Sequence, residues 1–226
     1  MPKSVVTFDI GQTLVDLDLD FLAVRLGQRG TPVSADALHA AAPKAWRLYD
    51  SLTESGASHP WHDLMETLLT GAGIADAEPI VQWLYDQQAT CNLWRKPIPP
   101  MIDLLRELRG RGVVTAALSN SEGHLRDLLE EIELAPLFDA IIDSGRVGVA
   151  KPDPRVFAIT LETLGVKPDV VVHVGDSWAA DVEGALAAGW HAIWYRSRSS
   201  TTKIDPRVPV AHNADETRAA LKSFGV

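Results

Sequence analysis

The chain has 226 residues, of which 46% are apolar and 23% charged, so it is long enough for one α/β domain with an insertion or for two small domains. Its formal net charge of −9 argues against nucleic acid or an anionic membrane as the main partner, and no apolar run approaches the roughly 20 residues that cross a bilayer. A single cysteine, Cys91, and the lack of a signal-peptide pattern predict a cytoplasmic protein. Both a monomer and a homodimer stay open.

The first predicted element is a short buried strand over residues 5–8, where the chain reads Val-Val-Thr-Phe. The strand ends at Asp9, and the residues at 11–13 form a turn. A carboxylate at the end of a buried strand is typical of sheets that carry their chemistry at one edge.

A helical pattern follows from residue 21 to about residue 88, and this stretch has no strand signals. Ser34 can cap one helix, Pro60 suits the first position of a second, and Pro79 opens a third. The pattern predicts a helical domain over residues 17–96, inserted after the first strand.

From about residue 97 the chain alternates between strands and helices, which predicts a Rossmann-like parallel sheet with helices on both faces. This α/β core domain comprises residues 1–16 and 97–226, and the polar stretch 197–203 is expected to be a loop. Strands are expected at residues 113–118, 138–142, 170–174 and 190–195, and helices at residues 100–109, 125–132, 155–164 and 179–188.

Polar residues stand where three of the predicted buried strands end. The first strand ends at Asp9, a later one at Ser119 and Asn120, and a third at Asp176, with Asp181 at the start of the next helix. Paired carboxylates at adjacent strand ends need a positive partner, and a divalent metal is the usual one. The sequence therefore predicts a Mg²⁺ site at the carboxyl edge of the sheet.

Four short motifs in this order resemble those of the haloacid dehalogenase (HAD) superfamily of hydrolases, most of which are phosphatases. Each motif alone is a weak signal, whereas four in order at the expected strand ends are specific. The motifs are Phe-Asp-Ile-Gly-Gln-Thr-Leu at 8–14, Leu-Ser-Asn at 118–120, Ser-Gly-Arg-Val-Gly-Val-Ala-Lys-Pro-Asp-Pro at 144–154, and Gly-Asp-Ser at 175–177 with Asp181.

The resemblance implies a role for each matching residue in phosphoryl transfer. Asp9 would be the nucleophile that forms an aspartyl-phosphate, and Lys151 would hold the nucleophile and the phosphate together by its charge. Ser119 would hydrogen-bond the phosphoryl oxygens, helped by the backbone of Asn120.

The resemblance also implies a metal site and a substrate-reading domain. Asp9, Asp176 and the carbonyl group of Gly11 would bind Mg²⁺, and Asp181 would position the metal shell. The helical insertion is similar to the C1 cap that closes over the site in this superfamily.

The chain departs from the phosphatase pattern at Gly11, where that pattern has a second aspartate that protonates the leaving group. General acid assistance of this kind is typically worth about 10²–10⁴-fold. Some similar proteins with glycine here look like sugar-1-phosphate phosphatases, and Gln12 or His62 is a candidate to position water instead.

The function that these residues favour is a Mg²⁺-dependent phosphomonoesterase (EC 3.1.3 type), and its expected partner is a small phosphorylated metabolite. A phosphonate hydrolase of the same superfamily is one alternative, although it needs a cap lysine for a Schiff base and Lys44 is the only candidate. A dehalogenase is disfavoured, because it is expected to lack the pair Gly175 and Asp176. A catalytically silent binding or regulatory protein is the third alternative, which Gly11 favours.

Overall fold

The computed structural model describes residues 4–55, 60–196 and 205–226, and the chain divides into two compact units. The core unit comprises residues 1–17 and 94–226, and the helical unit comprises residues 18–93. The boundaries predicted from the sequence, after residues 16 and 96, differ from these by one and three residues. The loop expected at 197–203 lies outside the described residues.

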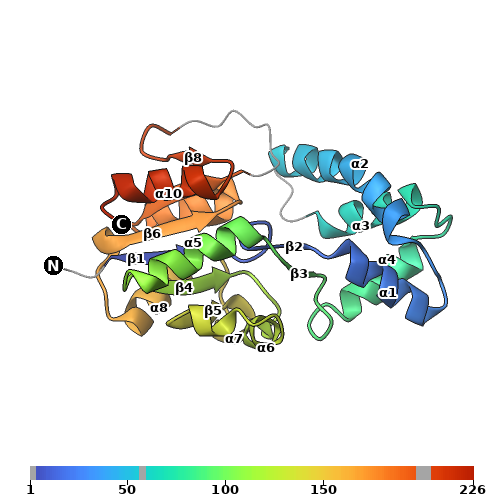
Figure 1. Ribbon diagram of the computed structural model, residues 1–226, viewed down its shortest axis with the longest axis horizontal. Helices are drawn as coiled ribbons and strands as arrows, with labels where there is room; N and C mark the ends of the chain where they lie inside the picture. The colour runs from blue at the N-terminus through green and yellow to red at the C-terminus, as the bar shows by residue number, and fades with distance from the viewer. Residues whose placement is uncertain (1–3, 56–59, 197–204) are drawn as a thin grey trace. The chain divides into compact units, whose positions relative to one another are not determined.

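The core unit contains a six-stranded parallel sheet, drawn in Figure 1, and the Rossmann-like α/β prediction is confirmed. The strand order is β5-β4-β1-β6-β7-β8, so the chain steps outward from β1 in one direction and later returns to fill the other side. The short strand β8 had no sequence signal. The strands are β1 (Val5–Phe8), β4 (Val114–Ser119), β5 (Ala140–Asp143), β6 (Val171–Gly175), β7 (His191–Tyr195) and β8 (Val210–Ala211).

Helices connect these strands, and right-handed crossovers place α5 and α6 on one face of the sheet and α8 and α9 on the other. The last helix, α10, packs against α5 and β7. The helices of the core unit are α5 (Pro99–Gly110), α6 (Leu125–Glu131), α7 (Ser144–Val147), α8 (Pro154–Leu164), α9 (Gly184–Ala187) and α10 (Ala214–Ser223), with 3₁₀ turns at Ala135–Leu137 and Pro168–Val170.

The prediction of one continuous helix over residues 179–188 is wrong, because the segment is divided into two elements. A π-helical turn, η3 (Trp178–Glu183), comes first, and only then does α9 begin. The carbonyl group of Ser177 accepts hydrogen bonds from the amides of both Asp181 and Val182, at 2.9 and 3.3 Å, which widens the turn. Such turns are frequent at functional sites, and this one carries Asp181.

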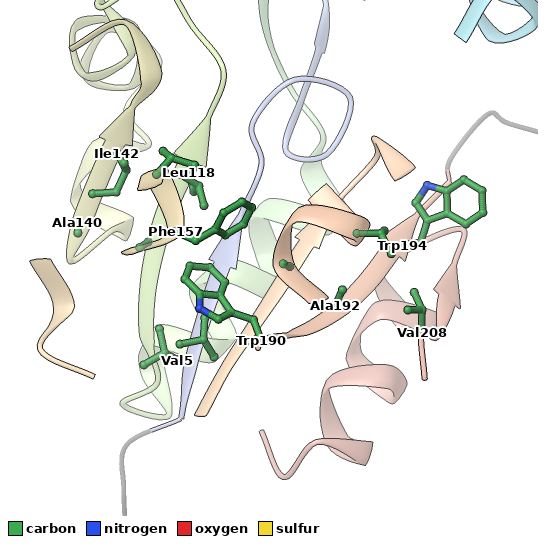
Figure 2. Close-up of a cluster of buried hydrophobic side chains, with 14 residues drawn as sticks. Val5, Leu118, Ala140, Ile142, Phe157, Trp190, Ala192, Trp194 and Val208 are labelled. Carbon is green, nitrogen blue, oxygen red and sulfur yellow. The ribbon is translucent and has the colours of Figure 1, made fainter. Parts of the chain in front are cut away.

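An apolar cluster lies between the sheet and the helices α8 and α9, and it supports the sheet rigidly. Figure 2 shows Phe157 of α8 and Trp190, which meet edge to face with ring centroids 5.1 Å apart. Val5 and Leu118 contribute to the same cluster from the sheet. Because both aromatic side chains are almost fully buried, the strands beneath the site have little freedom to shift.

A second, antiparallel pair of strands had no sequence signal. Strand β2 (Val15–Leu17) pairs with β3 (Trp94–Pro97), which places the boundary between the units at residues 17/18 and 93/94. Strands of three and four residues, the second of which ends in a proline, give too short an alternation to be recognised in the sequence.

The described residues of the helical unit form four helices with their connections and contain no strand. As predicted, Ser34 caps the second helix, since its hydroxyl accepts a hydrogen bond from the amide of Ala37 at 3.1 Å. Pro60 stands just before the third helix rather than at its first position. The helices are α1 (Leu19–Arg29), α2 (Ala35–Glu54), α3 (Trp61–Gly71) and α4 (Glu78–Asp86).

No helix in the described part of the chain combines the length and the apolar character that a membrane-spanning helix needs.

Candidate active site

Three aspartates meet at the carboxyl edge of the parallel sheet. Asp9 directly follows β1, Asp176 follows the adjacent strand β6, and Asp181 lies in η3. Each side chain offers an oxygen, and these oxygens lie within 4.8 Å of one another. Strands β1 and β6 flank the point where the strand order reverses, which is where open α/β sheets bind their ligands.

Lys151 joins two of these aspartates. Its ammonium group donates hydrogen bonds to Asp9 Oδ1 at 2.8 Å, to Asp181 Oδ1 at 2.6 Å and to the carbonyl oxygen of Leu118 at 2.6 Å. The lysine side chain is only 2% exposed. All three donor positions of the ammonium group are therefore used, and its charge is directed at Asp9.

Ser119 and Asn120, at the end of β4, contact Asp9 and Lys151 respectively. The Ser119 hydroxyl donates to Asp9 Oδ1 at 3.1 Å. The Asn120 side chain donates to the Lys151 carbonyl oxygen at 2.9 Å and accepts from the Lys151 amide at 2.8 Å. The sequence predicted only a backbone contact for Asn120, so this clamp on the Lys151 backbone is an additional finding.

Both oxygens of Asp181 are engaged by protein groups. Oδ1 contacts Lys151 and His173 Nε2, the latter at 3.0 Å, and Oδ2 accepts from the Ser177 amide at 2.8 Å. A carboxylate held in this way is suited to orient Lys151 rather than to bind a metal directly.

The buried charges shift the acidities of the whole group. Burial raises the pKa of Asp9, against the opposing effect of Lys151, and burial together with Asp9 and Asp181 raises the pKa of Asp176 well above its ordinary value. Burial opposes the charge of Asp181 as well, but Lys151 and His173 outweigh it and hold that pKa below its usual range. Burial would lower the pKa of Lys151, but Asp181 and Asp9 outweigh it and the pKa rises.

The donor set fits Mg²⁺. Oxygen ligands are those that this hard cation prefers, and Asp9 and Asp176 supply carboxylates from adjacent strands. Three carboxylates face one ammonium group, which leaves two negative charges in excess when all are ionised, and a divalent cation would balance them. Burial is the main cause of the raised pKa of Asp176, and the negative charges of Asp9 and Asp181 add to it.

Gly11 has space for a side chain. Its φ angle lies outside the left-handed region, and a Cβ atom added there would meet only the Trp94 ring, at 3.9 Å. The departure from the phosphatase pattern is therefore not imposed by backbone strain or by crowding at Cβ. The role of the Gly11 carbonyl group as a metal ligand stays a prediction.

Sequence reasoning missed two buried residues near the site. Asp143, at the end of β5, accepts hydrogen bonds from the Ser121 hydroxyl at 2.6 Å and from the amides of Gly123 and Leu125 at 3.1 and 2.9 Å, which holds the loop after Asn120. His173 interrupts an otherwise apolar strand, and this interruption was the signal that could have identified it.

Comparison with known proteins places the chain in a family. The family model for haloacid dehalogenase-like hydrolases matches residues 3–189. The chain belongs to this family. The predicted HAD resemblance is confirmed.

Curated relatives of this HAD hydrolase include named phosphatases. Haloacid dehalogenase-like hydrolase domain-containing protein 3 of Bos taurus is 32% identical over 203 residues, which cover 84% of this chain and 80% of the relative. Glyceraldehyde 3-phosphate phosphatase of Methanopyrus kandleri is 31% identical over 163 residues, 71% of this chain and 68% of the relative. Phosphoserine phosphatase of Thermus thermophilus is 41% identical over 102 residues, 44% of this chain and 41% of the relative.

Solved structures of low identity share the fold. A HAD hydrolase from Bacillus subtilis bound to magnesium is 20% identical, with a TM-score of 0.68 over 98% of this chain and 99% of that one. An L-2-haloacid dehalogenase from Xanthobacter autotrophicus is 21% identical, with a TM-score of 0.60 over 97% of this chain and 98% of that one. At this identity the likeness supports the fold and does not distinguish phosphatase from dehalogenase.

Position 175 of this HAD hydrolase requires glycine, because the side chain of Asp181 lies too close to leave room for a Cβ atom. A Cβ atom added at Gly175 would lie within 3.0 Å of the Asp181 side chain, a distance that real Cβ atoms essentially never show. We expect Gly175→Ala to displace Asp181 and to lower stability by about 1–3 kcal/mol, measured by urea unfolding. Gly110→Ala is the matched control, because nothing lies within 4 Å of the added atom. Equal stability of the two variants would contradict this account of Gly175.

Proposed function

We propose that this hydrolase is a Mg²⁺-dependent phosphomonoesterase that works through an aspartyl-phosphate on Asp9. The observation that carries the proposal is the anchoring of Asp9 by one oxygen. Oδ1 accepts from Lys151 and Ser119, and no hydrogen bond from a described residue reaches Oδ2. The carboxylate is thus fixed in direction while one oxygen remains for chemistry.

In the proposed reaction, the Asp9 carboxylate attacks phosphorus and the bond from phosphorus to the leaving oxygen breaks. Water then attacks the aspartyl-phosphate, which releases inorganic phosphate and regenerates the carboxylate. The Lys151 ammonium group faces the charge that develops on the phosphoryl oxygens. Mg²⁺, held by Asp9 and Asp176, would supply further charge stabilisation and orient the phosphate.

Phosphatase chemistry is favoured over the alternatives by the residues at the site. Asp176 adds a carboxylate that a metal-free dehalogenase would not need, and the phosphatases among the relatives match at 31% and 41% identity. Lys44, the one cap lysine considered for a Schiff base, lies exposed on α2. A small phosphorylated metabolite as substrate, the cytoplasm as location, and a cap role for residues 18–93 are parts of the same proposal.

The proposal predicts metal-dependent turnover of phosphate esters. In a panel of phosphate esters assayed with Mg²⁺, we expect release of inorganic phosphate that EDTA abolishes and that added Mg²⁺ restores. A 2-haloacid and a phosphonoaldehyde with borohydride serve as comparison substrates. Dehalogenation that persists in EDTA, or covalent trapping at a lysine, would reject the phosphatase assignment in favour of the corresponding alternative.

Because position 11 is a glycine, we expect the rate of hydrolysis to depend on the pKa of the leaving group. Without a carboxylate at this position, esters of acidic alcohols and phenols should react fastest, because they need little protonation. We expect a steep decline of rate with leaving-group pKa, and Gly11→Asp should raise turnover of alkyl phosphates, by up to about 10²-fold. Gly11→Ala, which adds a Cβ atom without a carboxyl group, is the control. A flat dependence in the wild type would mean that another residue donates the proton.

A further inference from the structure

A buried histidine lies next to the Lys151 and Asp181 pair and has no part in the mechanism above. His173 is 0% exposed, and the rings of Phe157 and Trp190 each pack against it with centroids 6.4 Å away. A polar ring in such surroundings is costly unless its nitrogen atoms are hydrogen-bonded.

Both ring nitrogens of His173 have partners from the site or from the strand beside it. Nδ1 lies 2.8 Å from Thr7 Oγ1, and Nε2 lies 3.0 Å from Asp181 Oδ1. Thr7 and His173 are also register partners in the adjacent parallel strands β1 and β6. The backbone of the sheet therefore sets the position of the ring.

The chemistry of the partners assigns the ring protons. Asp181 is ionised beside Lys151 and can only accept, so His173 Nε2 must carry a hydrogen and donate it. In the neutral ring, Nδ1 is then an acceptor and takes the hydroxyl hydrogen of Thr7. The result is a continuous chain of hydrogen bonds from Thr7 through His173, Asp181 and Lys151 to Asp9.

We propose that His173, oriented by Thr7, is a positioning residue that fixes Asp181 so that the Lys151 ammonium group is aimed at Asp9. His173 Nε2 and the Ser177 amide hold the two oxygens of Asp181, which prevents the carboxylate from rotating. Without His173, the carboxylate is held only by Ser177 and Lys151. The kinetic part of this inference rests on the proposed phosphatase function, whereas the hydrogen-bond chain does not.

The hydrogen-bond chain is tested without any activity. In long-range ¹H–¹⁵N spectra of the full chain labelled at histidine, with Mg²⁺ present, we expect the His173 ring to carry its hydrogen on Nε2 and that hydrogen to exchange slowly with water. A ring protonated on Nδ1 and bare at Nε2 would overturn the assignment.

The positioning role is tested by paired substitutions. We expect His173→Leu to lower kcat on the order of 10–100-fold, as loss of such outer partners does, with a much smaller change in KM. His173→Gln keeps an N–H that can reach Asp181, so it should recover most of this loss. His191→Leu is the matched control, because His191 lies exposed in the neighbouring strand β7, where its ring stacks on Phe224, and its kcat should equal that of the wild type.

Thr7→Val removes only the last link of the chain and covers the case in which His173→Leu fails to fold. We expect it to lower kcat about 2–10-fold, as loss of one buried hydrogen bond does, and to have no further effect when His173 is already leucine. Equal losses for leucine and glutamine at position 173, or additive effects of the two sites, would overturn the positioning role. If the wild type hydrolyses no phosphate ester, the proposed function fails, and the spectra alone decide the hydrogen-bond chain.

Discussion

Asp9→Asn should remove turnover of phosphate esters by at least about 10³-fold, as expected for loss of a nucleophile. The amide nitrogen and oxygen match the shape of the carboxylate, but neither forms the acyl phosphate. Steady-state release of inorganic phosphate in Mg²⁺ measures this effect.

The same variant should remain folded. Replacing Asp9 removes a carboxylate that faces Asp176 and Asp181, while Lys151 keeps Asp181 and the Leu118 carbonyl group as partners. We therefore expect a melting temperature no lower than that of the wild type in the absence of metal. Asp103→Asn, at an exposed position on α5 paired with Arg106, controls for the loss of one negative charge and should leave activity unchanged. Full activity in Asp9→Asn would reject the mechanism.

Lys151→Met should be the most destabilising single change at the site. It leaves Asp9 and Asp181 buried without their shared cation, and removal of one partner from a buried ion pair typically costs about 3–5 kcal/mol. Activity should fall together with stability, because the ammonium group that is proposed to face the phosphate is lost. Urea unfolding at neutral pH measures the free energy of unfolding.

The stability loss in Lys151→Met should depend on pH in a defined direction. In the wild type, burial already raises the pKa of Asp9 against the opposing effect of Lys151, so removal of Lys151 raises it further, and burial then raises the pKa of Asp181 as well. The folded variant therefore gains relative stability as it binds protons at lower pH. In the wild type the pKa of Asp181 lies below its usual range, so its contribution is lost only in acid. The difference between the proteins should therefore shrink from pH 7 towards pH 5. Lys44→Met, at an exposed site, is the control and should change stability by less than about 0.5 kcal/mol. A difference that does not change with pH would contradict the role assigned to the buried carboxylates.

The sequence alone predicted the parts of this protein that depend on local order. An apolar run followed by a polar turn marks where a strand ends, and this pattern is enough to locate Asp9, Ser119 and Asp176 at strand ends. The alternation of strands and helices predicted the parallel sheet, and motif order predicted the family that the comparisons confirm. Helix-capping chemistry is local as well, so the cap at Ser34 could be predicted.

The family resemblance implied that Asp9, Lys151 and Asp176 share one site, but only the tertiary structure shows which of their atoms meet and which other residues join them. Strand pairing is a contact between distant segments, and nothing local in the sequence states that β6 lies beside β1. That pairing brings His173 to Thr7 across 166 residues and Asp176 to Asp9, while the turn after α7 brings Lys151 to Asp9 across 142 residues. The π-helical turn that carries Asp181 also could not be predicted from the sequence. The side chain of Asp181 packs closely on Gly175 and bonds to Lys151 and His173, and these contacts join residues that are not local to the turn.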